Sequence, residues 1–181
     1  IERSFGNKTT WDRPFVDYIE KFAAEANAAV FDNGKYCKAL NVDVFELNYD
    51  FDLVYIDTPY ISRNGSCVDY YHFYHFLEGL CNYEKWEEMI DYSKKHRPLK
   101  PVKNIWNDKE KILNGFKQLF DSHRNSHIVV SYRSDGIPSI DELVKGMKDV
   151  KRNVQLYSFG EYRYVLSHNG SSQEMLIIGY D

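Results

Sequence analysis

The sequence predicts an α/β fold in which parallel core strands carry helices and the sheet closes with an antiparallel edge hairpin. Two apolar runs with strand character, residues 52–57 and 127–133, are separated by segments with helical periodicity. After residue 152 the tail changes to β-rich runs divided by turn residues. The 181 residues are 43% hydrophobic and 28% charged, which suits one core, and apolar runs of at most four residues exclude a membrane span.

The first element is an amphipathic helix predicted over residues 11–31. Its apolar side chains recur at helical spacing from Trp11, so one face is expected in the core, and Asn33-Gly34 ends it. A short strand is expected at residues 36–40, followed by a connection. The nearly continuous apolar run at residues 52–57 predicts a strand covered on both faces, as in a parallel sheet.

Helical patterns occupy the middle of the chain. Residues 68–80 and 83–96 predict two helices, and Pro98 ends the second because proline lacks the amide donor and clashes with the preceding turn. Residues 97–101 then form a basic loop. Asn107 is expected to cap the next helix, whose apolar side chains are Ile112, Leu113, Phe116, Leu119 and Phe120.

The last third of the chain combines one helix with several strands. Ser139 and Glu142 form a capping box that opens a helix over residues 139–150, with Leu143, Met147 and Val150 inward. Antiparallel strands are expected at residues 153–159, 161–167 and 174–179, with turns at Gly160 and residues 168–170. Since no repeat or composition break divides the sequence, residues 1–181 are predicted to form one domain.

The cysteines and the first residue bear on compartment and completeness. Cys37, Cys67 and Cys81 are an odd number at irregular spacing, which fits neither a disulfide framework nor a paired-cysteine zinc site and indicates the cytoplasm. The chain begins with Ile1 and shows no signal-peptide pattern, so we expect it to start inside a longer protein.

A net charge of −4 argues against a protein that coats nucleic acid by charge alone. A local basic run nevertheless stands in the loop after the second middle helix. We expect it to contact nucleic-acid phosphates, the alternative being a solvated charged loop. Its members are Lys94, Lys95, His96, Arg97, Lys100 and Lys103.

The segment Asp57-Thr58-Pro59-Tyr60 is the main candidate site. Ligands of open α/β sheets bind at the carboxyl ends of the strands, and this segment stands at such an end. The carboxylate and main-chain carbonyls can accept from a ring amino group while Tyr60 stacks on its face. The alternative is structural, with Asp57 capping a turn at Thr58-Pro59.

The same segment, preceded by Leu-Val-Tyr-Ile, resembles the Asp-Pro-Pro-Tyr motif of amino-group DNA methyltransferases, in particular the D12 class of adenine-N6 enzymes that includes the Dam methylases. Residues 131–136 and 174–178 extend the similarity, which runs from about Lys38 to the end. Thr58 replaces the usual first proline but keeps the carbonyl acceptors. The resemblance implies part of a Rossmann-like methyltransferase sheet, double-stranded DNA as substrate and S-adenosylmethionine as cofactor.

The resemblance also implies roles for single residues. Asp57 and the carbonyl of Thr58 or Pro59 would accept from the adenine amino group, and Tyr60 would stack on a base that has left the duplex. Ser131 and Arg133 would line the base pocket, although Arg133 could equally pair with Asp135. Apart from the resemblance, the small and polar makeup of the loop 61–69 predicts a mobile segment that closes over substrate, and its Arg63 is expected to contact DNA. The phosphate contacts would be Lys94, Lys95, Arg97, Lys100 and Lys103.

The cofactor residues implied by the resemblance are Asp43 and Val44, together with Asp57, the alternative being that Asp43 is a solvated loop residue. The family's Phe-x-Gly-x-Gly-type turn for the methionine part is missing, since none of the ten glycines lies within two positions of another. We therefore expect the chain to be the carboxyl-terminal part of an enzyme whose cofactor loop lies upstream. His72 and His75 lack a third ligand, so aromatic packing is favoured there over a metal site.

The function that this sequence predicts is S-adenosylmethionine-dependent methylation of the N6 amino group of adenine in DNA, of restriction-modification or Dam-like type, in a prokaryotic cytoplasm. One alternative is amino methylation of cytosine, RNA or a protein amide. The other is a non-catalytic DNA-binding or assembly module that keeps a methyltransferase-like sheet.

Overall fold

The computed structural model describes residues 14–47, 49–63, 65, 67, 69–161 and 172–181. The chain divides into two compact units, Ile1–Val42 and Asp43–Asp181, and each is described by itself. No helix among the described residues is long and apolar enough to cross a membrane.

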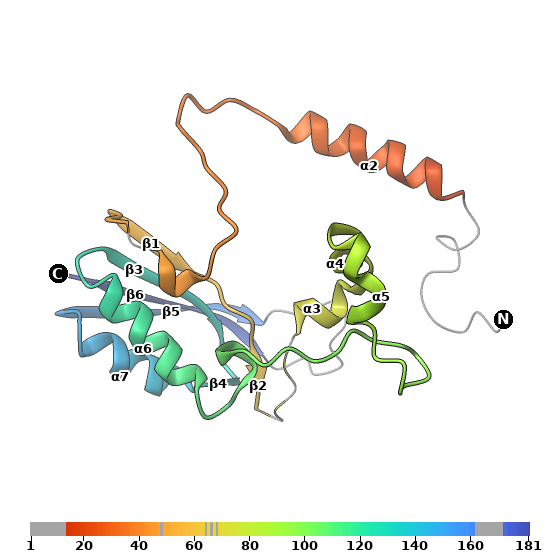
Figure 1. Ribbon diagram of the computed structural model, residues 1–181. Helices are drawn as coiled ribbons and strands as arrows, with labels where there is room; N and C mark the ends of the chain where they lie inside the picture. The colour runs from red at the N-terminus through yellow and green to blue at the C-terminus, as the bar shows by residue number, and fades with distance from the viewer. Residues whose placement is uncertain (1–13, 48, 64, 66, 68, 162–171) are drawn as a thin grey trace. The chain divides into compact units, whose positions relative to one another are not determined.

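The larger unit is built on a four-stranded mixed sheet with the order β1-β3-β6-β5 (Figure 1). β1 (Leu53–Ile56) runs parallel to β3 (His127–Arg133), with Ile56 opposite Val130. β6 (Gln173–Tyr180) is antiparallel to β3, and β5 (Asn153–Glu161) is antiparallel to β6. The predicted α/β class is therefore confirmed, because parallel strands meet an antiparallel edge as in part of a Rossmann-like methyltransferase sheet.

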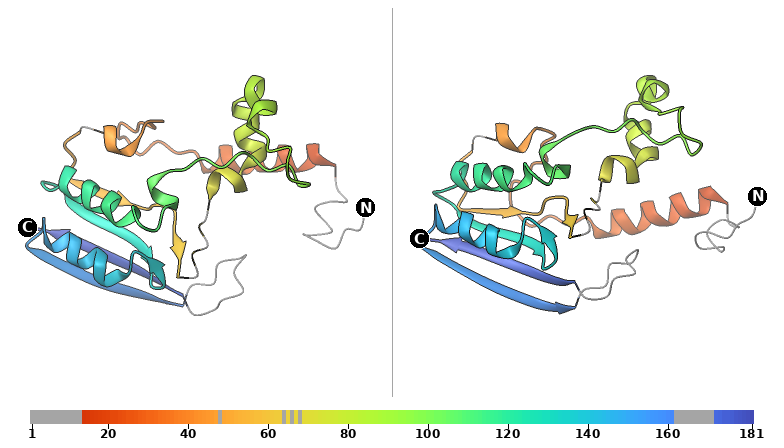
Figure 2. Two further views of the ribbon diagram at one scale, coloured as in Figure 1. Left: turned by 60° about the horizontal axis from the view of Figure 1, so that its bottom comes forward. Right: turned by 90° about the horizontal axis from the view of Figure 1, so that it is seen from below.

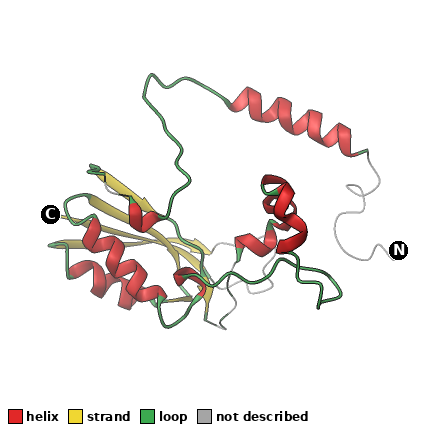
Figure 3. Cartoon of the chain, in the orientation of Figure 1, coloured by secondary structure: helices red, strands yellow, loops and turns green. Residues whose placement is uncertain are grey.

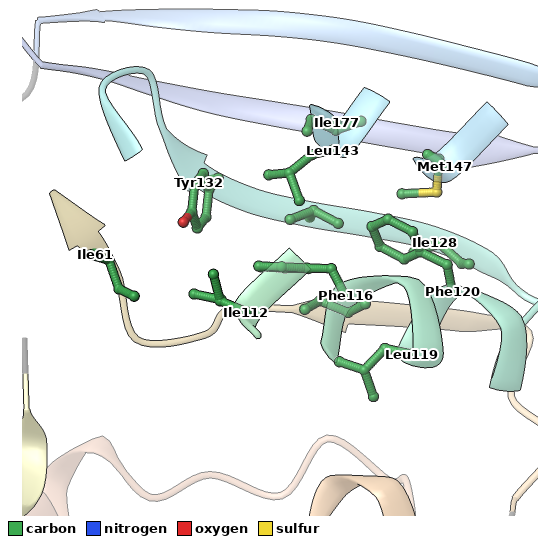
Figure 4. Packing of buried hydrophobic residues seen from close by; sticks show 12 residues of the cluster. Ile61, Ile112, Phe116, Leu119, Phe120, Ile128, Tyr132, Leu143, Met147 and Ile177 are labelled. Atoms are coloured by element: carbon green, nitrogen blue, oxygen red, sulfur yellow. The ribbon is translucent and has the colours of Figure 1, made fainter. Parts of the chain in front are cut away.

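Two helices cover one face of this sheet and form the core. Figure 2 shows α7 (Ile140–Lys148) over β5 and β6, and α6 (Ile112–Ser122) packs beside it. Every side chain at the centre is withdrawn from water, which stabilises the fold by about 1.5–3 kcal/mol per large apolar side chain. Figure 4 shows this packing of Phe116, Phe120, Leu143 and Met147 from the helices against Ile128, Tyr132 and Ile177 from the strands.

The expectation that the first strand is covered on both faces is wrong. Leu53 and Tyr55 are 55% and 57% exposed, whereas Ile56 on the other face is buried. The reason is position, since β1 is an edge strand and, among the described residues of this unit, α6 and α7 cover one face of the sheet. The more central β3 carries the continuous burial instead, from Ile128 to Tyr132.

The prediction of two long middle helices is also wrong, because the region forms several short helices instead (Figure 3). Non-helical backbone at Tyr74 and Asn82 interrupts the pattern, and the second predicted helix ends at Met89. Ile90 is extended and bridges to Leu99, so residues 90–99 form an irregular hairpin. The pieces are α3 (Tyr70–Phe73), α4 (His75–Cys81), η2 (Tyr83–Lys85) and α5 (Trp86–Met89).

Of the two predicted helix starts, one is confirmed. Ser139 Oγ accepts from the Glu142 amide, and the Glu142 carboxylate accepts from the Ser139 amide at 2.8 Å. Asn107, in contrast, does not cap α6, which begins at Ile112. It closes η3 (Ile105–Asn107), a 3-10 turn whose own capping box starts at Asn104.

The tail differs from expectation at Gly160. This residue has a φ of +79° inside β5, where the register shifts between Ser158 and Glu161, so it lies at a bulge rather than a turn. A left-handed φ is easy for glycine because it has no Cβ. Apart from Glu161, which ends β5, the expected strand 161–167 and the turn 168–170 lie outside the described residues.

The smaller unit contains α2 (Phe15–Ala29), which confirms a helix within the predicted range. Its apolar face is not in a core, however, since no residue of α2 is buried and Phe15 and Phe22 are 70% and 56% exposed. The predicted strand at residues 36–40 does not form. Periodicity predicts the helix, but a buried face or a strand also needs a partner, and the described residues of this unit supply none.

Candidate active site

The candidate site begins where β1 ends beside β3, which continues to Arg133. Since the strands are parallel and Ile56 lies opposite Val130, Asp57 follows β1 beside Ser131 of β3. Residues 57–60, which we call the motif segment, leave β1 without regular structure. The register thus brings together two regions that the sequence analysis had linked only by resemblance.

Tyr60 is fixed by two contacts. Its hydroxyl donates a hydrogen bond of 2.5 Å to Asp57 Oδ1, and its ring packs edge-on against the Tyr132 ring at 5.4 Å. Tyr132 is fully buried, contacts Phe116, and donates to the Ile137 carbonyl at 2.6 Å. Burial, and then the hydrogen bond to Asp57, raise the pKa of the Tyr60 hydroxyl above its ordinary value, so the group remains a donor.

Ser131 and Glu174 form the wall of the site on the side of β6. Ser131 Oγ donates to Glu174 Oε1 at 2.5 Å. The negative charge of Glu174 also contributes to raising the pKa of the Tyr60 hydroxyl. The sequence analysis gave Glu174 no role, because only the antiparallel pairing of β3 and β6 brings it to this edge.

Thr58 occupies the position where the family motif has proline. Its Oγ1 is buried and has no hydrogen-bond partner among the described residues. A buried hydroxyl without a partner is costly. This atom is therefore available to a ligand that binds beside Asp57.

Arg133 does not point toward a base but pairs with Asp135, which was the alternative kept open for it. Nε and Nη2 donate to the two carboxylate oxygens at 2.6 and 2.9 Å. Ser172 Oγ also donates to Asp135, at 2.7 Å. Hydrogen bonds from Arg133 are the main cause of a lowered pKa at Asp135. A DNA contact of Arg133 stays a prediction.

The loop after the motif segment is tied down at its start. β2 (Ile61–Ser62) pairs antiparallel with β4 (Gly136–Ile137), and Ile61 is buried. The Arg63 amide donates to the Asp135 carbonyl at 2.9 Å. The Arg63 side chain is exposed, as a DNA contact requires, and that role stays a prediction.

A small hollow of about 100 Å³ opens beside the motif segment. Aromatic rings and side-chain amides line it. At its rim, the pKa of the Tyr70 hydroxyl is raised, mainly by burial and secondly by the negative charge of Asp57. The lining residues are Pro59, Cys67, Asp69, Tyr70, Tyr71, Asn104, Trp106 and Asn107.

Comparison with known proteins gives a consistent result. The chain is 32% identical over 141 residues to the modification methylase StsI of Streptococcus sanguinis, an alignment covering 77% of this chain and 20% of that protein. It is 28% identical over 127 residues to the type II methyltransferase M.FokI of Planomicrobium okeanokoites, covering 68% of the chain and 18% of the relative. The chain is a distant homologue of type II DNA modification methylases.

A third relative is the type II methyltransferase M2.HphI of Haemophilus parahaemolyticus, 30% identical over 120 residues, covering 65% of this chain and 31% of the relative. The chain spans about a fifth of the length of the StsI and FokI methylases. No family profile and no solved structure matches it.

Asp43, the candidate cofactor residue of this methylase homologue, caps a short turn. Its Oδ1 accepts from the Phe45 amide at 2.9 Å at the start of η1 (Val44–Glu46). Val44 is partly buried against the core. Asp43 itself is exposed, so its other acceptor positions face solvent, and a role in binding cofactor stays a prediction.

The basic run lies on the irregular hairpin and just beyond it. Lys94 Nζ is 3.7 Å from Asp91 Oδ2, Lys100 Nζ donates to the Glu88 carbonyl, and the Arg97 guanidinium stacks 5.4 Å from the Tyr92 ring centre. Lys95 and Lys103 are exposed and make no ion pair with a described residue. Contact with phosphates stays a prediction for all five cations.

The two histidines of the middle region have internal partners. His72 Nδ1 lies 2.6 Å from Asp69 Oδ2, and Trp86 Nε1 donates to His75 Nε2 at 3.0 Å. The described part of the chain contains no cluster of three or more His, Cys, Asp or Glu side chains arranged for a metal ion. The expected aromatic core packing is wrong here, because Phe73 and Phe76 are 65% and 56% exposed.

Proposed function

We propose that the chain carries the catalytic motif of an S-adenosylmethionine-dependent DNA methyltransferase of restriction-modification type that acts on the N6 amino group of adenine. The observation that carries the proposal is the placement of Asp57 and Tyr60 just after the carboxyl end of β1, beside Ser131 of the neighbouring strand β3. The distant homology to DNA modification methylases supports it.

The geometry supports methyl transfer to a ring amino group. The nitrogen of such a group is a poor nucleophile, because its lone pair is delocalised into the ring, and acceptors on its hydrogens favour the tetrahedral, nucleophilic form. Asp57 is exposed, and Tyr60 occupies only its Oδ1, so Oδ2 is available as one acceptor. The carbonyl of Thr58 or Pro59 is the other, and the Tyr60 ring stacks on the base. Because the amino group is unreachable within the duplex, the base is extruded first.

S-adenosylmethionine would supply an electrophilic methyl group on its sulfonium. The residues near the motif segment and in η1 suit part of this cofactor. Asp43 is an exposed acceptor, Val44 offers apolar surface, and Thr58 Oγ1 is a buried hydroxyl without a described partner. The sequence has no glycine-rich turn for the methionine part. We therefore retain the proposal that residues 1–181 are part of a larger catalytic domain.

The DNA contacts of the proposal come from two groups of residues. Arg63 and Ser131 stand close to the motif segment, and Arg133 would act near them only after release from Asp135. The second group is the basic run, in which Lys95 and Lys103 are exposed without a described ion pair.

The test is a methylation assay with the full-length protein, tritiated S-adenosylmethionine and unmethylated DNA, followed by digestion to nucleosides. We expect label in N6-methyladenine, its loss in Asp57→Ala, and its retention in the matched control Asp52→Ala, which removes an exposed carboxylate at the opposite end of β1. Label in N4-methylcytosine would overturn the adenine assignment. Label only in RNA or protein, or none, would overturn DNA methylation.

A further inference from the structure

Lys109 lies against the loop that follows the motif segment, although it is distant from that loop in the sequence. A Cβ placed on Gly65 would overlap Lys109 Nζ and lie 2.5 Å from its Cε. Gly65 has a φ of +77°, a left-handed conformation that suits glycine. The absence of a side chain at Gly65 thus lets the Lys109 ammonium reach the backbone of this loop.

The position of Lys109 is set by the segment that carries it. Trp106 stacks on Phe45 at 5.7 Å and contacts Phe116 edge-on at 5.5 Å, so η3 is anchored to the core. The Cys67 thiol donates to the Trp106 carbonyl at 3.9 Å, and Cys67 bridges back to Ile61. Residues 104–107 therefore pack directly against the loop, and Lys109 follows two residues later.

The charge of Lys109 is uncompensated in the part of the chain that the structure describes. Its neighbour Lys111 pairs with Asp108 at 3.4 Å, whereas Lys109 is exposed and has no ion pair with a described residue. The Arg63 side chain on the same loop is likewise exposed and unpaired within that part. One exposed cation without a described ion pair, Arg63, is therefore on the loop next to the motif segment, and a second, Lys109, lies against that loop.

We propose that Lys109, which lies against the loop that also carries Arg63, binds a backbone phosphate of the DNA strand beside the extruded target base. The inference rests on the proposed function, because a base that enters at residues 57–60 brings its flanking phosphates to the adjoining loop. A phosphate diester carries one negative charge and exposed acceptor oxygens, which a lysine ammonium binds as a point charge. Such a contact positions the strand and carries no sequence information.

The test compares Lys109→Ala with Lys111→Ala in the full-length protein. Both variants remove one exposed lysine of the same segment, but only Lys111 is paired with a carboxylate. Binding of unmethylated duplex DNA is measured at several salt concentrations. We expect the slope of log K against log salt to shrink by about 0.9 in Lys109→Ala, the value for one lost phosphate contact, and to stay unchanged in Lys111→Ala.

Further variants separate charge from folding. Lys109→Arg keeps the cation and should keep the slope, while Gly65→Ala places a methyl group where the ammonium lies and should reproduce the loss. Thermal melting checks that each variant is folded. Equal slopes for Lys109→Ala and Lys111→Ala, in a protein that still methylates DNA, would overturn the phosphate contact alone. A reduced slope in a protein that does not methylate DNA would support the contact and overturn the proposed methyl transfer.

Discussion

The Tyr60 hydroxyl donates a hydrogen bond of 2.5 Å to Asp57 Oδ1, so the two side chains assigned to the target base are already joined to each other. The bond orients the carboxylate and leaves Oδ2 open, as the proposed acceptor role of Asp57 requires. The Tyr60 ring is held from behind by Tyr132, which is fully buried. The core of the sheet thus fixes both the acceptor and the stacking surface before substrate binds.

The first prediction separates the Tyr60 ring from its hydroxyl. Tyr60→Ala should weaken binding of DNA with an extruded base by about 1–3 kcal/mol, because a stacking face is lost. Tyr60→Phe should retain most of that affinity, since the ring remains. Binding isotherms for both variants at several salt concentrations make the measurement. A changed salt slope in Tyr60→Ala would mean that Tyr60 touches the DNA backbone rather than a base.

The second prediction concerns the rate of methyl transfer. Asp57→Ala removes an acceptor whose interaction strengthens as the amino nitrogen becomes tetrahedral, so the single-turnover rate should fall by about 10²-fold or more. Affinity for DNA and cofactor should change far less. Rapid-quench experiments with excess enzyme measure the rate directly. A near-normal rate would show that Asp57 is only a turn residue.

The four strands of the main sheet and the position of the motif segment were predictable because each depends on local pattern. The apolar run ending in Asp57 predicts both β1 and the site at its end, and Ser139 with Glu142 predicts the start of α7. The exposed face of β1 was not predictable, because it depends on which strand forms the edge. Glu174 and Lys109 reach the site through pairing and packing between distant segments, which no local pattern encodes.

The middle region shows where periodicity misleads. Residues 68–96 have apolar side chains at helical spacing, but the backbone leaves the helix at Tyr74 and Asn82, and the second predicted helix ends at Met89. Many of the aromatic rings pack on one another instead of on the sheet, as Tyr70 does on Tyr74 at 5.9 Å. The amphipathic spacing in this region therefore reflects local contacts between aromatic rings, not one continuous helix packed in a core.

The third prediction tests the basic run with the two lysines that lack a described ion pair. Lys95→Ala/Lys103→Ala should weaken DNA binding equally on all sequences, and the log–log salt slope should shrink by about 0.9 per lost contact. The matched control is Lys145→Ala/Lys148→Ala, which removes two exposed lysines from α7. If both double variants gave the same slope, the basic run would be a solvated loop.

The last prediction concerns the Arg133–Asp135 pair, which holds the loop after the motif segment through the Asp135 carbonyl and the Arg63 amide. Hydrogen bonds from Arg133 lower the pKa of Asp135 in the folded protein. Because this pKa is lower in the folded than in the unfolded protein, the pair stabilises the fold at pH values above the ordinary aspartate pKa of about 3.9. The stabilisation is lost as the pH falls through the pKa that Asp135 has in the folded protein.

Asp135→Asn should therefore lower the urea midpoint of unfolding near neutral pH, and its difference from the unmodified protein should shrink as the pH falls below about 4. The effect should be modest, because the Asp135 side chain is 37% exposed and solvent screens the pair. Asp149→Asn, at an exposed aspartate without an ion pair to a described residue, is the control. The opposite outcome is a difference in urea midpoint between Asp135→Asn and the unmodified protein that stays constant down to acid pH. It would show that the carboxylate charge does not hold this loop, and the pairing of β2 with β4 would then be its anchor.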